Sequence, residues 1–129
     1  MLLYTTFLID AERSDSYLDK LIDDDDDVAV AAITVAELKV GVELSKGKTK
    51  QSRQSLVEEI VASVPIVDYD LQVAEAHAAL LVEVRRQGRP RGAHDLIIAA
   101  SALSSDRVIV TADQSAFRDL PGVTALCHR

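Results

Sequence analysis

The stretch Gly92–Asp113, GAHDLIIAASALSSDRVIVTAD, decides the fold. Its first part, Asp95 to Ser104, is almost wholly apolar and predicts a buried helix. DRVIVTAD follows as a β-branched run that ends at an acid, which is typical of a buried strand. A buried helix that leads into a buried strand indicates an α/β protein whose parallel sheet is covered on both faces.

The rest of the chain continues this alternation. Strands are predicted at MLLYTTFLI (1–9), at VPIVDYD (64–70) and around 123–126, and VAVAAI (28–33) is a further short apolar stretch. Helices are predicted at 14–22, from Thr34 to near Ser45, at 51–62 after the polar connection KGKTK, and from Asp70 to Gln87, where Gly88 ends the helix. The sequence therefore predicts one α/β domain over residues 1–129.

Size and composition exclude several classes of protein. The chain has 129 residues, 48% hydrophobic and 27% charged, as an ordinary globular domain has. No apolar run approaches the roughly 20 residues that span a bilayer, so no membrane association is expected. The N-terminus lacks the features of a secretory signal, and the lone Cys127 fits a reducing compartment. These observations predict a cytoplasmic protein.

Charge is segregated along the chain. The net charge of −7 argues against a nucleic-acid partner, but the acids concentrate between Asp10 and Asp27. Basic residues form one stretch from Lys39 to Arg53 and a second of Arg85, Arg86, Arg89 and Arg91. Each basic stretch is either a phosphate-binding surface or a solvated helix end.

Three acids lie beside apolar runs, where a solvated charge is least expected: Glu37, Asp95 and Asp113. Strand ends in a parallel sheet meet at one edge, so these carboxylates are expected to converge there. Crowded carboxylates repel unless a cation offsets them, and oxygen ligands suit Mg²⁺ or Mn²⁺. Each acid also has a simpler interpretation. Glu37 closes a capping box with Thr34, Asp95 caps a helix, and Asp113 forms an Asx turn.

The order Thr-Thr-Phe-Leu-Ile, Ala-Glu-Leu, His-Asp-Leu-Ile-Ile-Ala-Ala and Thr-Ala-Asp resembles a PIN domain, and within that family the VapC type of bacterial toxin. The resemblance implies a three-layer sandwich with a central, mostly parallel sheet of four or five strands. It implies a Mg²⁺- or Mn²⁺-dependent endoribonuclease toxin of a toxin–antitoxin pair, acting on structured RNA such as tRNA. Glu37, Asp95 and Asp113 would be metal ligands and catalytic residues, with Thr5 and Thr111 as supporting polar residues. The resemblance also implies a VapB-like antitoxin and a second copy of the chain as partners. From the charge pattern, the stretches from Arg85 to Arg91 and from Lys46 to Arg53 are expected to hold the phosphate backbone of the RNA.

The chain departs from the family pattern at its front. The first strand of PIN domains ends in an aspartate, and here Tyr4 precedes Thr5. The acid is either substituted by Tyr4 or deleted after it, and a tyrosine phenol is a poor Mg²⁺ ligand at neutral pH. A catalytically inactive PIN scaffold that binds RNA or antitoxin is therefore the main alternative. A phospho-acceptor signalling domain also gathers acids at strand ends, but it needs a lysine after a late strand, where this chain has Thr111-Ala112-Asp113.

Overall fold

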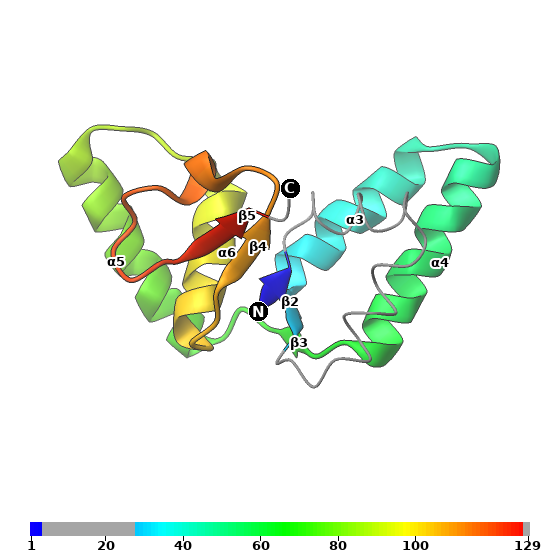
Figure 1. Cartoon of the computed structure of the whole chain (residues 1–129), viewed down its shortest axis with the longest axis horizontal. Coiled ribbons are helices and arrows are strands. Elements are labelled where there is room, and N and C mark those ends of the chain that lie inside the picture. Colours follow the sequence, from blue (N-terminus) through cyan, green and yellow to red (C-terminus); the bar gives the residue numbers. More distant parts are fainter. Residues whose placement is uncertain (4–27, 128–129) are drawn as a thin grey trace.

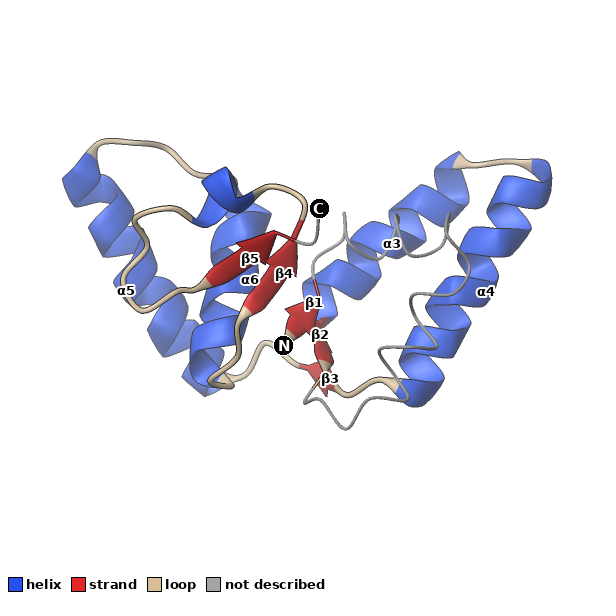
Figure 2. Cartoon of the chain, in the orientation of Figure 1, coloured by secondary structure: helices blue, strands red, loops and turns tan. Residues whose placement is uncertain are grey.

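The computed structural model of the chain describes residues 1–3 and 28–127. Within them, five short strands form one sheet in the order β3-β2-β1-β4-β5. The strands are β1 (Leu2–Leu3), β2 (Ala29–Ala31), β3 (Ile66–Val67), β4 (Ile109–Thr111) and β5 (Ala125–Cys127). Each neighbouring pair is parallel. Because the strands are parallel, their carboxyl ends lie at the same edge of the sheet (Figure 2).

Helices cover both faces of this sheet, which gives three layers (Figure 1). The helices are α3 (Ala32–Leu44), α4 (Gly47–Ser63), α5 (Leu71–Gln87), α6 (Ala93–Ser104) and the short 3-10 helix η1 (Gln114–Phe117). Helices α3 and α4 pack on one face, and α5 and α6 pack on the other (Figure 1). The prediction of an α/β sandwich with a parallel sheet of four or five strands is confirmed.

Alternation along the strands builds two separate cores. Leu2 contributes to the core beneath α5 and α6, whereas Leu3 contributes to the core beneath α3 and α4. Both side chains are 0% exposed. Burial of a leucine contributes about 1.5–3 kcal/mol, so even this two-residue strand is firmly anchored.

The ends of α5 follow the sequence signals closely. Oδ1 of Asp70 accepts a hydrogen bond from the Val73 amide at 2.9 Å and caps the helix. Gly88 ends the helix with φ of 65°, in the left-handed region that glycine adopts without steric cost. The predicted helix from Asp70 to Gln87 is therefore confirmed.

Two other helix starts differ from the prediction. Helix α3 begins at Ala32 with Ala31 at its N-cap and no side-chain cap, so the capping box predicted for Thr34 is wrong. Thr34 is instead fully buried within the helix. Helix α4 begins at Gly47, inside the predicted polar connection KGKTK. The predicted helix at 14–22 lies outside the described residues.

Within the part of the chain that the structure describes, no helix is long and apolar enough to cross a lipid bilayer.

Candidate functional site at the carboxyl edge of the sheet

Glu37 lies in α3, which starts directly after β2 at the carboxyl edge of the sheet. Its side chain is 25% exposed, and Oε2 lies 3.7 Å from Nδ1 of His94. His94 belongs to the first turn of α6 and is more exposed. This contact joins the second turn of α3 to the first turn of α6, so Glu37 and Asp95, the residue after His94, belong to one region of the surface.

Asp95 is the third residue of α6 and the acid of its first turn. A carboxylate at this position is stabilised by the amide dipoles at the start of the helix. Gly92, and not Asp95, occupies the N-cap. The Asp95 carboxylate lies against the backbone of Gly92, because a Cβ atom built on Gly92 would meet Oδ2 at 2.7 Å. The interpretation of Asp95 as an N-cap is therefore wrong. Asp95 lies in the first turn of the helix, with its carboxylate against Gly92.

Asp113 follows β4 and is the N-cap of η1. Its Oδ1 accepts hydrogen bonds from the Ser115 amide at 3.1 Å and from the Ser115 hydroxyl. Its own amide donates to Oγ1 of the fully buried Thr111 at 3.0 Å. The turn predicted for Asp113 is confirmed, and Thr111 holds the backbone that carries this acid. Ser115 was missed, although a hydroxyl residue two positions after an aspartate is a recognisable capping signal.

The three acids are placed by elements that meet at the carboxyl edge, but their side chains do not form a ready-made metal centre. Across residues 1–3 and 28–127, no group of three or more His, Cys, Asp or Glu side chains is arranged to hold a metal ion. The donors are all oxygens, which is the chemistry that Mg²⁺ and Mn²⁺ prefer. Oδ1 of Asp113 is engaged by Ser115 in the cap of η1, so a cation bound there would share this oxygen with the cap. Tyr4 and Thr5 lie outside the described residues.

The arginines of the second basic stretch differ in their surroundings. Arg86 is exposed and reaches Glu83 only at 4.0 Å, and exposed pairs of this kind contribute little stability. Arg89 pairs with Asp119 at 3.0 Å. Arg91 donates to backbone carbonyls of the segment that contains η1. The sequence places these arginines in one basic stretch. Arg91, however, is fixed by hydrogen bonds to backbone carbonyls, whereas Arg86 approaches Glu83 only to 4.0 Å.

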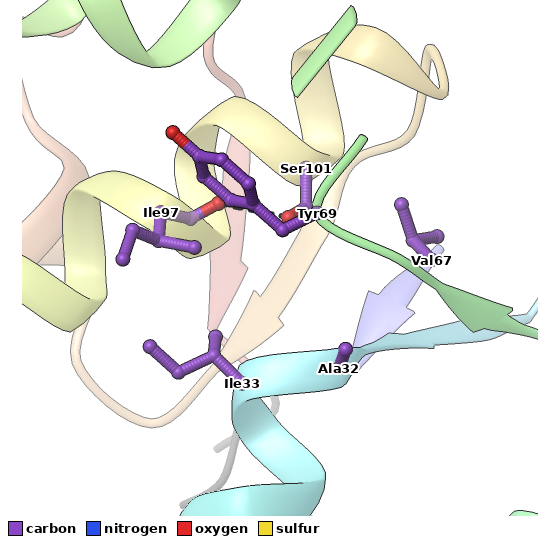
Figure 3. Close-up of a pocket in the computed structure, with 6 residues that line it drawn as sticks. All are labelled: Ala32, Ile33, Val67, Tyr69, Ile97 and Ser101. Atoms are coloured by element: carbon purple, nitrogen blue, oxygen red, sulfur yellow. Dashed lines mark hydrogen bonds between the residues drawn. The ribbon is translucent and has the colours of Figure 1, made fainter. Parts of the chain in front are cut away.

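A small apolar cavity lies between α3, β3 and α6 (Figure 3). Its volume is about 200 Å³, and its lining residues are Ala32, Ile33, Val67, Tyr69, Ile97 and Ser101. The Tyr69 hydroxyl makes a 2.8 Å hydrogen bond with Nδ1 of His77, and the Ser101 hydroxyl donates to the Ile97 carbonyl. The cavity therefore offers mainly apolar surface.

A sequence model described as "PIN domain" matches residues 1–123. Because the match covers nearly the whole sequence, the chain belongs to the PIN domain family, and the predicted resemblance is confirmed.

Several named relatives are similar over most of their length. Ribonuclease VapC2 of Rickettsia felis is 29% identical over 114 residues, which cover 87% of this chain and 84% of that protein. The tRNA(fMet)-specific endonuclease VapC of Salmonella typhimurium is 31% identical over 96 residues, which cover 74% and 71%. A chain in the crystal structure of VapBC2 from Rickettsia felis, bound to a DNA fragment from their promoter, superposes with a TM-score of 0.85 at 26% identity. That superposition covers 99% of this chain and 98% of the other. The chain is thus similar to VapC proteins in both sequence and fold.

Proposed function

We propose that this chain is a metal-dependent endoribonuclease toxin of a VapBC-type toxin–antitoxin pair. The observation that carries the proposal is the PIN domain match, and it is supported by the start of α3, the start of α6 and the end of β4, the elements that carry or precede Glu37, Asp95 and Asp113. Relatives named as ribonucleases, similar over most of their length, support the same activity.

In this proposal, Glu37, Asp95 and Asp113 would hold Mg²⁺ or Mn²⁺, which would supply an activated water and stabilise the leaving oxygen of an RNA phosphodiester. The start of α6 orients the Asp95 carboxylate against Gly92. Thr111 fixes the backbone of Asp113, and the Asp113 carboxylate, which accepts from Ser115, would supply an oxygen to the cation.

The proposed substrate is structured RNA, and tRNA is the class that the name of the Salmonella relative supports. Arg85 and Arg86 lie in the last turn of α5, and Figure 1 shows the end of α5 and the tip of β4 both on the upper side of the molecule, with the end of α5 further to the left. Cations there would hold the phosphate backbone while the acids act on one bond.

The proposed partners are a VapB-like antitoxin and a second copy of the chain, in the cytoplasm. Support for the antitoxin comes from the fold, which is similar to that of a chain in a VapBC2 complex.

A catalytically inactive PIN scaffold that binds RNA or antitoxin is the second candidate. The observation in its favour is Tyr4, which stands where the family has its first acid. Without that carboxylate, the remaining acids would hold the cation and its water less firmly.

Cleavage of a tRNA pool distinguishes the two candidates. The chain is incubated with Mg²⁺, with Mn²⁺ or with EDTA, and new RNA ends are mapped by sequencing. The proposed nuclease makes internal cuts that need the metal and disappear in Asp95→Asn and Glu37→Gln. Asp106→Asn is a matched control, because Asp106 is exposed with φ of 54°, a conformation that asparagine also tolerates. RNA retention without cutting, equal in the unmodified chain and in Asp95→Asn, would favour the scaffold.

A further inference from the structure

The loop between α5 and α6 is tied to the segment around η1 by a row of side chains. Nε2 of Gln87 donates to the Asp119 carbonyl at 2.8 Å, and Nη2 of Arg89 meets Oδ2 of Asp119 at 3.0 Å. These contacts hold Asp119 at φ of 62°, in the left-handed region that is uncommon for residues other than glycine. The two segments therefore form one connected unit.

Arg91 makes the densest connection in this unit. Its Nη1 donates to the carbonyls of Ser115 at 3.1 Å and of Ala116 at 3.4 Å, and its Nη2 donates to the carbonyl of Arg118. The Ser115 carbonyl also accepts from the Arg118 amide at 3.4 Å, so Arg91 shares that acceptor. Carbonyl oxygens near the end of a helix carry partial negative charge, which suits a guanidinium. Arg91 is half-buried, and within the described residues its Nε is buried without a hydrogen-bond partner. The guanidinium is thus oriented toward the protein.

Each of the two segments is connected along the chain to one candidate metal ligand, Asp95 or Asp113. Arg91 directly precedes Gly92, the N-cap of the helix that positions Asp95. On the other side, the carbonyls that receive Arg91 belong to or directly follow η1, the helix that Asp113 caps. Any shift of η1 relative to the loop would therefore change the separation between Asp95 and Asp113.

We propose that Arg91 is a positioning residue that sets the distance between the Asp95 and Asp113 carboxylates, and with it the affinity for a divalent cation. The inference rests on the proposed role of these acids as metal ligands. It separates Arg91 from Arg85 and Arg86, because its two terminal nitrogens already serve three backbone carbonyls.

The experiment measures Mn²⁺ affinity of the full chain without RNA, from the electron paramagnetic resonance signal of free Mn²⁺. Arg91→Ala should weaken the affinity by about ten- to a hundredfold, as removal of residues that orient metal ligands commonly does. The Mn²⁺ affinity of Arg91→Lys should lie between those of the unmodified chain and Arg91→Ala, because an ammonium group keeps the charge but lacks the forked donors of a guanidinium. Arg53→Ala is the matched control, since Nη1 of Arg53 also donates to a backbone carbonyl, that of Gly41, but in the layer of α3 and α4.

A second readout tests the positioning step itself. Hydrogen–deuterium exchange of the amides from Asp113 to Arg118 should speed up in Arg91→Ala and, to a smaller extent, in Arg91→Lys. Amides of β2 should keep their protection, which would show that the rest of the fold is intact. If Arg91→Ala does not fold, Arg91→Lys decides both readouts.

The outcomes separate the inference from the function on which it rests. Mn²⁺ bound equally well by the unmodified chain and by the Arg91 variants would overturn the inference and leave the proposed metal site standing. No Mn²⁺ binding by the unmodified chain, with Asp95→Asn no different, would overturn both. Loss of RNA affinity in Arg91→Ala with unchanged Mn²⁺ affinity would show that Arg91 contacts phosphate instead.

Discussion

The Asp95 carboxylate occupies space that exists only because residue 92 is glycine. A Cβ atom on Gly92 would lie 2.7 Å from Oδ2 of Asp95, closer than real Cβ atoms come, and 3.3 Å from Cγ, which is a tight contact. The backbone of Gly92 has φ of −59° and ψ of 135°, a conformation open to any residue. The position of the Asp95 carboxylate therefore requires a glycine at residue 92, whereas the backbone conformation there does not.

Gly92→Ala should move the Asp95 carboxylate without unfolding the protein. Because alanine fits the backbone and restricts the unfolded chain, the free energy of unfolding should stay level or rise by up to about 1 kcal/mol. Mn²⁺ affinity should nevertheless fall by about tenfold or more, since the ligand is displaced. Gly41→Ala is the control, because a Cβ there meets only Nη1 of Arg53 at 3.8 Å, an ordinary contact. Unchanged Mn²⁺ affinity in Gly92→Ala would mean that Asp95 binds no metal in its present orientation.

Ser115→Ala should raise the affinity for Mn²⁺. The Ser115 hydroxyl donates to Oδ1 of Asp113, so this bond competes with a cation for the negative charge of the carboxylate. A hydrogen bond to a charged group is worth about 1.5–3 kcal/mol when protected and less when exposed, which predicts a gain of roughly three- to tenfold. Titration calorimetry measures the gain, with Ser104→Ala as a control whose hydroxyl donates to Ser101 in α6. A loss of affinity would instead assign Ser115 the role of orienting Asp113.

Combined replacement of Arg85 and Arg86 by alanine should reduce the salt dependence of RNA binding. For each phosphate that the variant no longer binds, the slope of log affinity against log salt should become shallower by about 0.7–0.9. Filter binding of tRNA across a salt series measures the slope. The pair Lys46→Ala and Lys48→Ala tests the other basic stretch in the same assay. If the slope keeps its value without Arg85 and Arg86, these arginines are a solvated helix end.

The fold was predictable because its signals are strong and local. Leu2, Leu3, Ile109 and Val110 are apolar without alternation, as residues of a sheet with two covered faces must be. Asp70 and Gly88 mark the ends of α5 by their own conformational preferences. The family pattern then located Glu37, Asp95 and Asp113, which the structure places in elements that meet at the carboxyl edge.

What the sequence did not predict depends on contacts between distant segments. Nothing near Arg91 distinguishes it from Arg86, because the carbonyls that it contacts lie more than twenty residues away. The prediction for Thr34 was wrong for a related reason. The pattern Thr34-x-x-Glu37 fits a capping box locally, but burial against the sheet extends the helix to Ala32. Tertiary packing overrode a local signal at Thr34, whereas at Arg91 there was no local signal to read.

Thr34→Val should stabilise the protein. Thr34 is fully buried, and within the described part of the chain its Oγ1 has no hydrogen-bond partner. Replacing an unpaired buried hydroxyl by a methyl group should raise the free energy of unfolding by about 1 kcal/mol in a urea titration. Thr111→Val is the matched contrast, since Thr111 is equally buried but accepts from the Asp113 amide, and its loss should destabilise. A lower stability of Thr34→Val would reveal a hydrogen bond to this hydroxyl in the folded chain.

Tyr4→Asp should increase metal-dependent RNA cleavage by about ten- to a hundredfold, the range expected when a group that helps to fix the metal is restored. Tyr4→Asn, whose side chain has the size of aspartate without its charge, should not increase cleavage.

Inserting an aspartate between Tyr4 and Thr5 should repair the site less well than Tyr4→Asp. To bring that acid to the position after Leu3, the strand must shift by one residue, which exchanges its two faces and drives Tyr4 into the place of Leu3. Leu3 is 0% exposed among Val30, Leu38 and Val110, and a larger side chain there would overpack the core. Equal cleavage by the unmodified chain and by Tyr4→Asp would show that the fourth acid is dispensable, whereas full repair by the insertion alone would identify a deletion.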